Sequence, residues 1–277
     1  MKKRFDAKKF AEELILLIAT VLMLAPIYYF VLGAFKTRKS IVKHPLIITK
    51  EMFTLGNFPR AIKAMKYWRA IRNTGTITLV SLILIIFCAS LAGFAIARVR
   101  YKLFELYYSL LVTCMVVPFV ACVIPLVVQA VRFGTHNSLL GPILIQVGWN
   151  IPFATFLFTG FMRGISRDLE DAAYIDGCST FGVYSRIFLP LLAPVTASCC
   201  IVSGIGIWND YLVSLSILSV TDYPTLMVGM NGFFSEKGNE LGYAFAGILL
   251  ASIPMIVLFL FLQKYFIKGI AAGSVKG

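Results

Sequence analysis

Six long apolar runs limit what this chain can fold into. A helix needs about 20 mostly apolar residues to cross the hydrocarbon core of a bilayer. Stretches of that kind occupy roughly residues 14–35, 74–97, 106–131, 138–162, 191–212 and 243–266. Only helices and closed barrels satisfy their backbone groups in lipid, and these runs lack the alternating polarity of barrel strands. The sequence therefore predicts an all-α, polytopic membrane protein with six transmembrane helices.

The composition indicates the same class. The chain is 59% hydrophobic and 14% charged, whereas soluble domains carry about 25% charged residues. We expect a single transmembrane domain over residues 1–277. Its predicted parts outside the spans include an N-terminal tail at about 1–12, an outer segment at about 36–73 and a C-terminal tail at about 267–277.

The N-terminus sets the expected orientation. Five basic residues, Lys2, Lys3, Arg4, Lys8 and Lys9, precede the first apolar run. A signal peptide begins in the same way, but this run is about 22 residues long and lacks a small-residue cleavage pattern at its end. We therefore expect an uncleaved first span with a cytoplasmic N-terminus. An even number of spans then places both termini in the cytoplasm.

A polar stretch, residues 166–190, interrupts the apolar C-terminal part of the chain. Asp168 is predicted to cap a first helix, with Asp171 at its third position and Glu170 adding negative charge to the first turn. Gly177 can take the left-handed conformation that ends a helix. A second helix is expected over roughly residues 180–188, ending at Pro190, which cannot continue the preceding hydrogen-bond ladder.

This stretch resembles the EAA loop of ABC importer permeases. The pattern D-A-A-x3-G-x9-I-x-L-P is carried by Asp171, Ala172, Ala173, Gly177, Ile187, Leu189 and Pro190. Glu170 and Asp176 fit further positions of the family, and Asp171 replaces its glutamate with a carboxylate one methylene shorter. The two alanines are expected to form a small-residue surface. The resemblance implies that residues 163–190, between spans four and five, form a cytoplasmic coupling helix that docks in a cleft of an ATPase.

The resemblance covers the whole chain and implies its partners. They are a second permease subunit in a heterodimer, an ATPase dimer and an extracytoplasmic sugar-binding protein, assembled in a bacterial cell membrane. ATP and magnesium would be used by the ATPase. We expect this chain to bind no cofactor, to catalyse no reaction and to carry no P-loop.

Five residues are candidates for a substrate pathway. The run Trp208, Asn209 and Asp210 resembles the carbohydrate branch of the family, that of the maltose-type second permease, although a tryptophan at a membrane interface is also an ordinary anchor. Gln146 and Asn150 share a helix face. They can line a sugar path or bond a neighbouring helix, and both interpretations stay open.

The outer segment is strongly basic, with ten basic residues and one acid in 36–73. Residues 57–72 are predicted to form a helix at the outer interface. Its expected apolar face consists of Phe58, Ala61, Ile62, Met65 and Trp68. Contact with anionic lipid, docking of an acidic binding protein and attraction of an anionic solute remain alternatives.

Other chemistry is not predicted. His44 and His136 lack neighbouring ligands for a metal site, and no cysteine falls in a predicted outer segment, so no disulfide framework is expected. Pro118 and Pro125 are expected to kink the third span. The sequence thus predicts the transmembrane subunit of an ATP-driven importer for a sugar, such as an oligosaccharide. A polyamine, amino-acid or ion importer and an ATPase-independent secondary transporter stay open.

Overall fold

The computed structural model describes residues 7–99, 101–234 and 241–274 of the 277-residue chain. Over these residues the backbone is helical, and one isolated bridge pairs Lys36 with Phe53. Lys2, Lys3, Arg4 and the last three residues of the predicted C-terminal tail lie outside the described part. The long elements are α1 (Ala7–Ala34), α4 (Tyr67–Arg98), α5 (Lys102–Cys114), α6 (Phe119–Arg132), α7 (Leu140–Arg163), α11 (Ala193–Trp208) and α14 (Leu241–Ser274).

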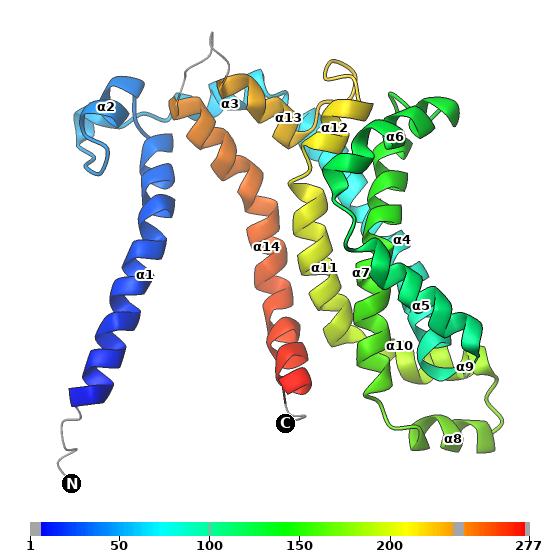
Figure 1. Ribbon diagram of the computed structural model, residues 1–277. Coiled ribbons are helices and arrows are strands. Elements are labelled where there is room, and N and C mark those ends of the chain that lie inside the picture. Colours follow the sequence, from blue (N-terminus) through cyan, green and yellow to red (C-terminus); the bar gives the residue numbers. More distant parts are fainter. Residues whose placement is uncertain (1–6, 100, 235–240, 275–277) are drawn as a thin grey trace. The chain divides into compact units, whose positions relative to one another are not determined.

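Four of these described helices, α1, α4, α7 and α14, are long and apolar enough to cross a membrane (Figure 1). Two bent helix pairs pass the same test when each pair is taken together. They are α5 with α6, bent by 106°, and residues Thr180–Leu191 with Ala193–Trp208, bent by 68°. Counting each pair as one span gives six. Five of them coincide with predicted apolar runs, whereas the fifth span begins at Thr180, eleven residues before the predicted run at 191–212.

The third predicted span is not one kinked helix. α5 ends at Cys114, and Pro118 is the residue that precedes α6. Because proline has no amide hydrogen and disfavours a helical residue before it, a single helix does not pass this point. Pro125, which was also expected to kink the span, lies inside α6 without ending it.

The helix predicted over residues 57–72 is also divided. α3 covers Asn57–Ala64, Lys66 has a positive φ of 48°, and α4 begins at Tyr67. Ala61 and Met65 are buried, but Trp68 belongs to α4 and is 71% exposed. The predicted continuous apolar face was therefore wrong, because the break at Lys66 changes the direction of the chain.

The chain forms two compact units. The first contains Met1–Tyr67 and Gly229–Ser252, and the second contains Trp68–Val228 and Ile253–Gly277. The first unit includes α1, the short helices α2 (Arg38–Lys43) and η1 (Lys50–Met52), and α3. α13 (Leu226–Asn231) and α14 contribute residues to both units, and η3 (Gly232–Phe234) follows α13.

Aromatic packing holds the first unit together. The Phe245 ring of α14 makes edge contacts with Tyr29 and Phe30 of α1, at centroid distances of 5.3 and 5.2 Å. A Cβ atom on Gly33 would lie 2.2 Å from the Phe245 ring, so this approach requires a residue without a side chain.

The second unit is built on α4, α7 and α11. α7 packs against α5 and α11, and α12 (Leu212–Ile217) packs against α6 and α7. α4 and α7 meet at Gly93, where a Cβ atom would lie 2.9 Å from Phe158 Cβ and 3.1 Å from the amide nitrogen of Thr159. The two helices therefore touch at backbone distance.

The start of α4 fastens the segment that follows α12. The Asn73 side chain donates to the carbonyl of Pro224 at 2.9 Å, and Thr74 Oγ1 accepts from the amide of Leu226 at 3.0 Å. Both α4 residues are buried, so their hydrogen bonds are needed to satisfy polar groups away from water.

Candidate functional site

Residues 164–192, here called the interspan loop, connect α7 to α11. Figure 1 shows its first helix, α8 (Asp168–Ile175), lying crosswise beyond the end of α7. Ser166 starts this helix: its hydroxyl accepts from the Asp168 amide at 3.2 Å and donates to Asp168 Oδ2 at 2.8 Å. The predicted cap was wrong, since Asp168 is the first helical residue and Arg167 is the N-cap without a side-chain capping bond, while the Ser166 hydroxyl satisfies the first amide of the helix. Asp168, Glu170 and Asp171 all lie in the first turn, where the helix dipole favours acids.

The end of α8 confirms the turn predicted at Gly177. Gly177 has a φ of +79°, in the left-handed region. Its amide donates to the carbonyl of Tyr174 at 3.0 Å, and the amide of Cys178 donates to that of Ala173 at 2.9 Å. This pair of hydrogen bonds is a Schellman motif, which satisfies the last carbonyls of the helix.

The second half of the interspan loop is a continuous helical segment that contains one π-helical turn. α9 (Thr180–Val183) is capped by Ser179, whose hydroxyl accepts from the Gly182 amide at 3.2 Å. It continues into the π-helix η2 (Tyr184–Phe188) and then α10 (Leu189–Leu191). This helical segment ends at Leu191, one residue beyond the predicted end at Pro190. A π turn bonds residues five apart, which relieves the clash between a proline ring and the carbonyl four residues earlier.

The π-helical turn η2 packs against one face of α4. Ser90 and Phe94 lie one turn apart on α4, and the Ser90 hydroxyl is 2.8 Å from the hydroxyl of Tyr184. The Phe94 ring contacts those of Tyr184 and Phe188, at centroid distances of 5.4 and 5.0 Å. Tyr184 and Phe188 are buried, so the loop is anchored in the core of the second unit.

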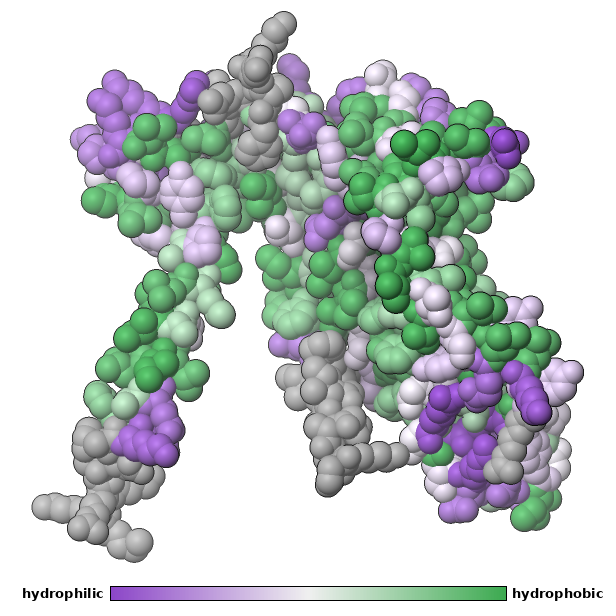
Figure 2. Space-filling model, viewed as in Figure 1, coloured by the Kyte–Doolittle hydropathy of each residue, from purple (hydrophilic) through white to green (hydrophobic). Residues whose placement is uncertain are grey.

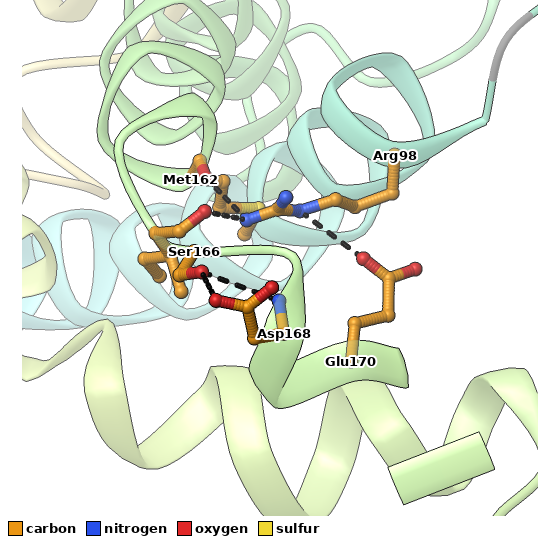
Figure 3. Close-up of polar contacts among 6 residues, drawn as sticks. Arg98, Met162, Ser166, Asp168 and Glu170 are labelled. Carbon is orange, nitrogen blue, oxygen red and sulfur yellow. Dashed lines mark hydrogen bonds and ion pairs between the residues drawn. The ribbon is translucent and has the colours of Figure 1, made fainter. Parts of the chain in front are cut away.

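Arg98, one further turn along α4, connects this helix to the end of α7 and to α8 (Figure 3). Its side chain is 3% exposed. Nη2 donates to the carbonyls of Met162 at 2.6 Å and Ile165 at 2.9 Å, at the end of α7. The guanidinium carbon also lies 4.7 Å from the centroid of the Phe188 ring, in a cation–π contact.

Glu170 supplies the opposite charge. Its Oε2 lies 3.6 Å from Arg98 Nε, and its side chain is 13% exposed. That distance defines an ion pair but exceeds a normal hydrogen bond. Glu170 therefore faces its own chain. Sequence reasoning missed Arg98, because an arginine that ends a span is usually a surface anchor and only the fold brings it to Glu170.

The outward face of the loop combines acids with large apolar side chains. Asp171, Ala172, Asp176, Gly177, Leu189 and Pro190 are exposed, and Ile187 is half-buried. Ile175 is 85% exposed and Phe181 is 70% exposed. Ala173 is buried against the core, so only one of the two alanines predicted to form a small-residue surface is available. Such a face suits a partner with an apolar cleft and basic groups.

The candidate pathway residues on α7 bond to each other. Gln146 is buried, and the Asn150 side chain donates to the Gln146 carbonyl at 2.8 Å. A small pocket nearby is lined by Phe119, Val123, Leu126, Val127, Ile145, Val213, Ser216 and Ile217. None of the five predicted pathway residues is in that lining.

The other three pathway candidates lie where α11 gives way to α12. Trp208 is buried, and Asn209 is exposed. The carboxylate of Asp210 accepts from the amides of Val213 at 3.2 Å and Ser214 at 2.9 Å, and from the Ser214 hydroxyl at 2.8 Å. Asp210 therefore caps the start of α12.

Over the residues that the structure describes, no group of three or more His, Cys, Asp or Glu side chains could hold a metal ion. The six cysteines are free thiols.

The fold and the interspan loop define a class: a multi-span helical membrane protein with a folded helix–glycine–helix loop beyond the end of one span. The sequence matches the family of the binding-protein-dependent transport system inner membrane component over residues 85–272, and the chain belongs to this family. It is thus a membrane-embedded transport component, and the matched region includes the whole interspan loop.

Individual relatives agree with this assignment. The chain is 39% identical over 222 residues to the melibiose/raffinose/stachyose import permease protein MelC of Bacillus subtilis, covering 80% of each chain. It is 29% identical over 276 residues to the probable starch degradation products transport system permease protein AmyC of Thermoanaerobacterium thermosulfurigenes, covering 99% of each. A bacterial ABC transporter involved in the import of the acidic polysaccharide alginate contains a chain with the same fold, with a TM-score of 0.81 at 17% identity, covering 96% of this chain and 100% of that one.

Proposed function

We propose that this chain is a transmembrane subunit of an ATP-driven importer of an oligosaccharide. It forms part of the translocation pathway and receives the motion of a cytoplasmic ATPase through α8. The names of MelC and AmyC support a sugar as the solute. The observation that carries the coupling role is the outward face of α8, which exposes Asp171 and Ile175 on a helix whose C-terminal end is closed by a Schellman motif.

The proposal includes three kinds of partner. They are a second permease subunit in a heterodimer, an ATPase dimer that binds ATP and magnesium, and an extracytoplasmic sugar-binding protein. A second similar structure, of the alginate transporter with an alginate pentasaccharide-bound periplasmic protein, supports the last of these. In this arrangement α8 and both chain termini face the cytoplasm, and the chain itself supplies the pathway without binding a nucleotide.

Several exposed residues of the interspan loop have roles in the proposed docking. Asp171 and Asp176 form charge-assisted hydrogen bonds with basic groups of the ATPase. Ile175 fills an apolar cleft, and Ala172 and Gly177 allow the partner backbone to approach closely. Ile187, Leu189 and Pro190 shape the path back to the membrane. Gln146, Asn150, Trp208, Asn209 and Asp210 remain the candidates for contact with the sugar.

Arg98 extends this proposal from docking to transmission. When the ATPase moves α8, Glu170 moves toward or away from a guanidinium that is bonded to the end of α7 and belongs to α4. The present 3.6 Å separation leaves room for the pair to shorten into a hydrogen bond. The force on the loop therefore reaches two spans directly.

The test compares Asp171→Lys with Asp222→Lys in the reconstituted importer. Asp222 is an exposed acid of the segment between α12 and α13 and provides a matched change of charge. We expect Asp171→Lys to keep the wild-type unfolding temperature, to lose co-purifying ATPase and to abolish ATP-dependent oligosaccharide uptake. Asp222→Lys should retain uptake. Wild-type uptake by Asp171→Lys would count against the docking role.

A second candidate solute is an anionic sugar, which the basic segment 36–73 favours. Uptake of neutral and uronic oligosaccharides, each at low and high salt, separates the two. A salt-sensitive preference for the uronic sugar would support the anionic solute, and uptake independent of salt would remove the reason for it. Polyamine, amino-acid and ion uptake in the same assay tests the non-sugar alternatives, and uptake without ATP would indicate a secondary transporter.

A further inference from the structure

The segment between α1 and α3, residues 36–55, is a folded loop held from inside by a lysine. Lys36 is fully buried, and its ammonium donates to the carbonyl of His44 and, at 3.5 Å, to that of Pro45. The base of the loop is closed by the amide of Thr54, which donates to the carbonyl of Phe35 at 2.8 Å. A buried charge is tolerated only with such partners, so the loop has a defined shape.

The tip of this loop lies alongside α1. The hydroxyl of Tyr28 donates to the carbonyl of Leu46 at 3.2 Å. Tyr28 precedes the last residue of α1, Ala34, by six positions, which corresponds to about 9 Å of helix. α1 is one of the four spans identified by length and composition. The loop therefore folds back along the end of a membrane span.

The exposed side chains of the loop are of two kinds. Leu46 is 58% exposed, Ile47 60% and Val42 68%. Basic side chains flank this apolar group and are also exposed: Arg38, Lys39, Lys43 and Lys50. In Figure 2 hydrophilic residues gather over α2, and hydrophobic residues lie below them on the side of α1. The apolar side of this loop thus lies toward α1, and its basic side lies farther from the span.

We propose that residues 38–50 form a docking surface for anionic phospholipid, with the apolar tip in the bilayer interface and the basic residues at the headgroup phosphates. Apolar side chains beside a span enter the acyl boundary, and long basic side chains reach back to the phosphates. A protein partner would not require the tip to lie beside the membrane-spanning part of α1. The proposal needs only the membrane location of the chain and is independent of the transported solute.

The test places the photoreactive residue p-benzoylphenylalanine at Ile47 in the complete importer. The importer is reconstituted into nanodiscs with equal parts of phosphatidylcholine and phosphatidylglycerol, and the adducts are identified by mass spectrometry. We expect phospholipid adducts, with phosphatidylglycerol enriched roughly fivefold, the effect of one basic side chain at an anionic surface. Adducts mainly to another protein subunit, or to both lipids equally, would overturn the proposal.

Two matched controls show whether the basic side chains of this loop cause the enrichment of phosphatidylglycerol. The same probe at Leu22, which is 67% exposed in the middle of α1, should give lipid adducts without headgroup preference. Lys43→Gln with Lys50→Gln should remove most of the enrichment at Ile47, because the phosphates lose their partners. Lys102→Gln with Arg132→Gln removes the same charge outside this loop and should leave the enrichment unchanged. Equal loss in both double variants would contradict a local lipid site.

Discussion

Removing the charge of Glu170 tests the internal connection between α8 and the spans. Glu170→Gln keeps the size of the side chain and takes away the counter-charge of Arg98, whose side chain is 3% exposed. Arg98 keeps its hydrogen bonds to the carbonyls of Met162 and Ile165. The variant therefore isolates the ion pair from the rest of the cluster.

The distance between Glu170 and Arg98 sets the size of the expected loss of stability. Two unit charges 3.6 Å apart attract by about 4–5 kcal/mol at an effective dielectric constant of about 20. Removing both groups from water offsets much of this attraction. We expect Glu170→Gln to lower the free energy of unfolding by about 1–2 kcal/mol. Arg98→Met should lower it by about 3–5 kcal/mol, because the α7 carbonyls also lose their donor.

The assay is a double-mutant cycle with two readouts. Thermal unfolding of wild type, Glu170→Gln, Arg98→Met and the double variant gives the coupling energy, and the ratio of sugar transported to ATP hydrolysed gives the mechanical effect. We expect each single variant to lower the unfolding temperature and the ratio of sugar transported to ATP hydrolysed. Additivity within about 0.3–0.5 kcal/mol, together with a wild-type transport ratio, would refute the reasoning.

A shorter but exposed ion pair provides the control. Glu105 lies 2.9 Å from Arg163, with side chains that are 64% and 42% exposed. Exposed pairs contribute little because water screens them. Glu105→Gln should therefore change the free energy of unfolding by less than about 1 kcal/mol.

Two further predictions concern the ends of helices. Gly177→Val should weaken ATPase co-purification and speed hydrogen exchange at the Cys178 amide, because a side chain at φ +79° costs about 1–2 kcal/mol. Gly177→Asn, which tolerates this conformation, should do so less, and equal exchange rates in all three proteins would contradict the argument. Asp210→Ala should lower the free energy of unfolding by about 0.5–2 kcal/mol, because the amides of Val213 and Ser214 at the start of α12 lose their acceptor. A wild-type unfolding temperature in this variant would contradict the capping role.

The sequence predicted what depends on local chemistry. The apolar runs located the spans because the hydrocarbon thickness fixes their length, and Gly177 marked the end of α8 because few other residues adopt its φ. The cap was placed one residue too late, at Asp168, because aspartate is a good capping residue whereas the observed N-cap, Arg167, has no side-chain capping bond.

Long-range packing accounts for what sequence reasoning missed. The π turn before Pro190 is held by Phe94 of α4, which lies far away in the sequence. Arg98 meets Glu170 only after α4, α7 and the interspan loop have assembled. The break between α5 and α6 also escaped prediction, because a proline in a span more often bends a helix than divides it.

Gly93 has a mechanical consequence for these helices. It lies five residues before Arg98, so α4 touches α7 at Phe158 and again at Met162. Two contact points between α4 and α7 restrict rotation and sliding of one helix against the other, so the pair moves as one rigid unit. A methyl group at position 93 would push α4 and α7 apart at this contact, so even Gly93→Ala would loosen the pair near the end of α4 while leaving every chemical group of the Arg98 cluster intact.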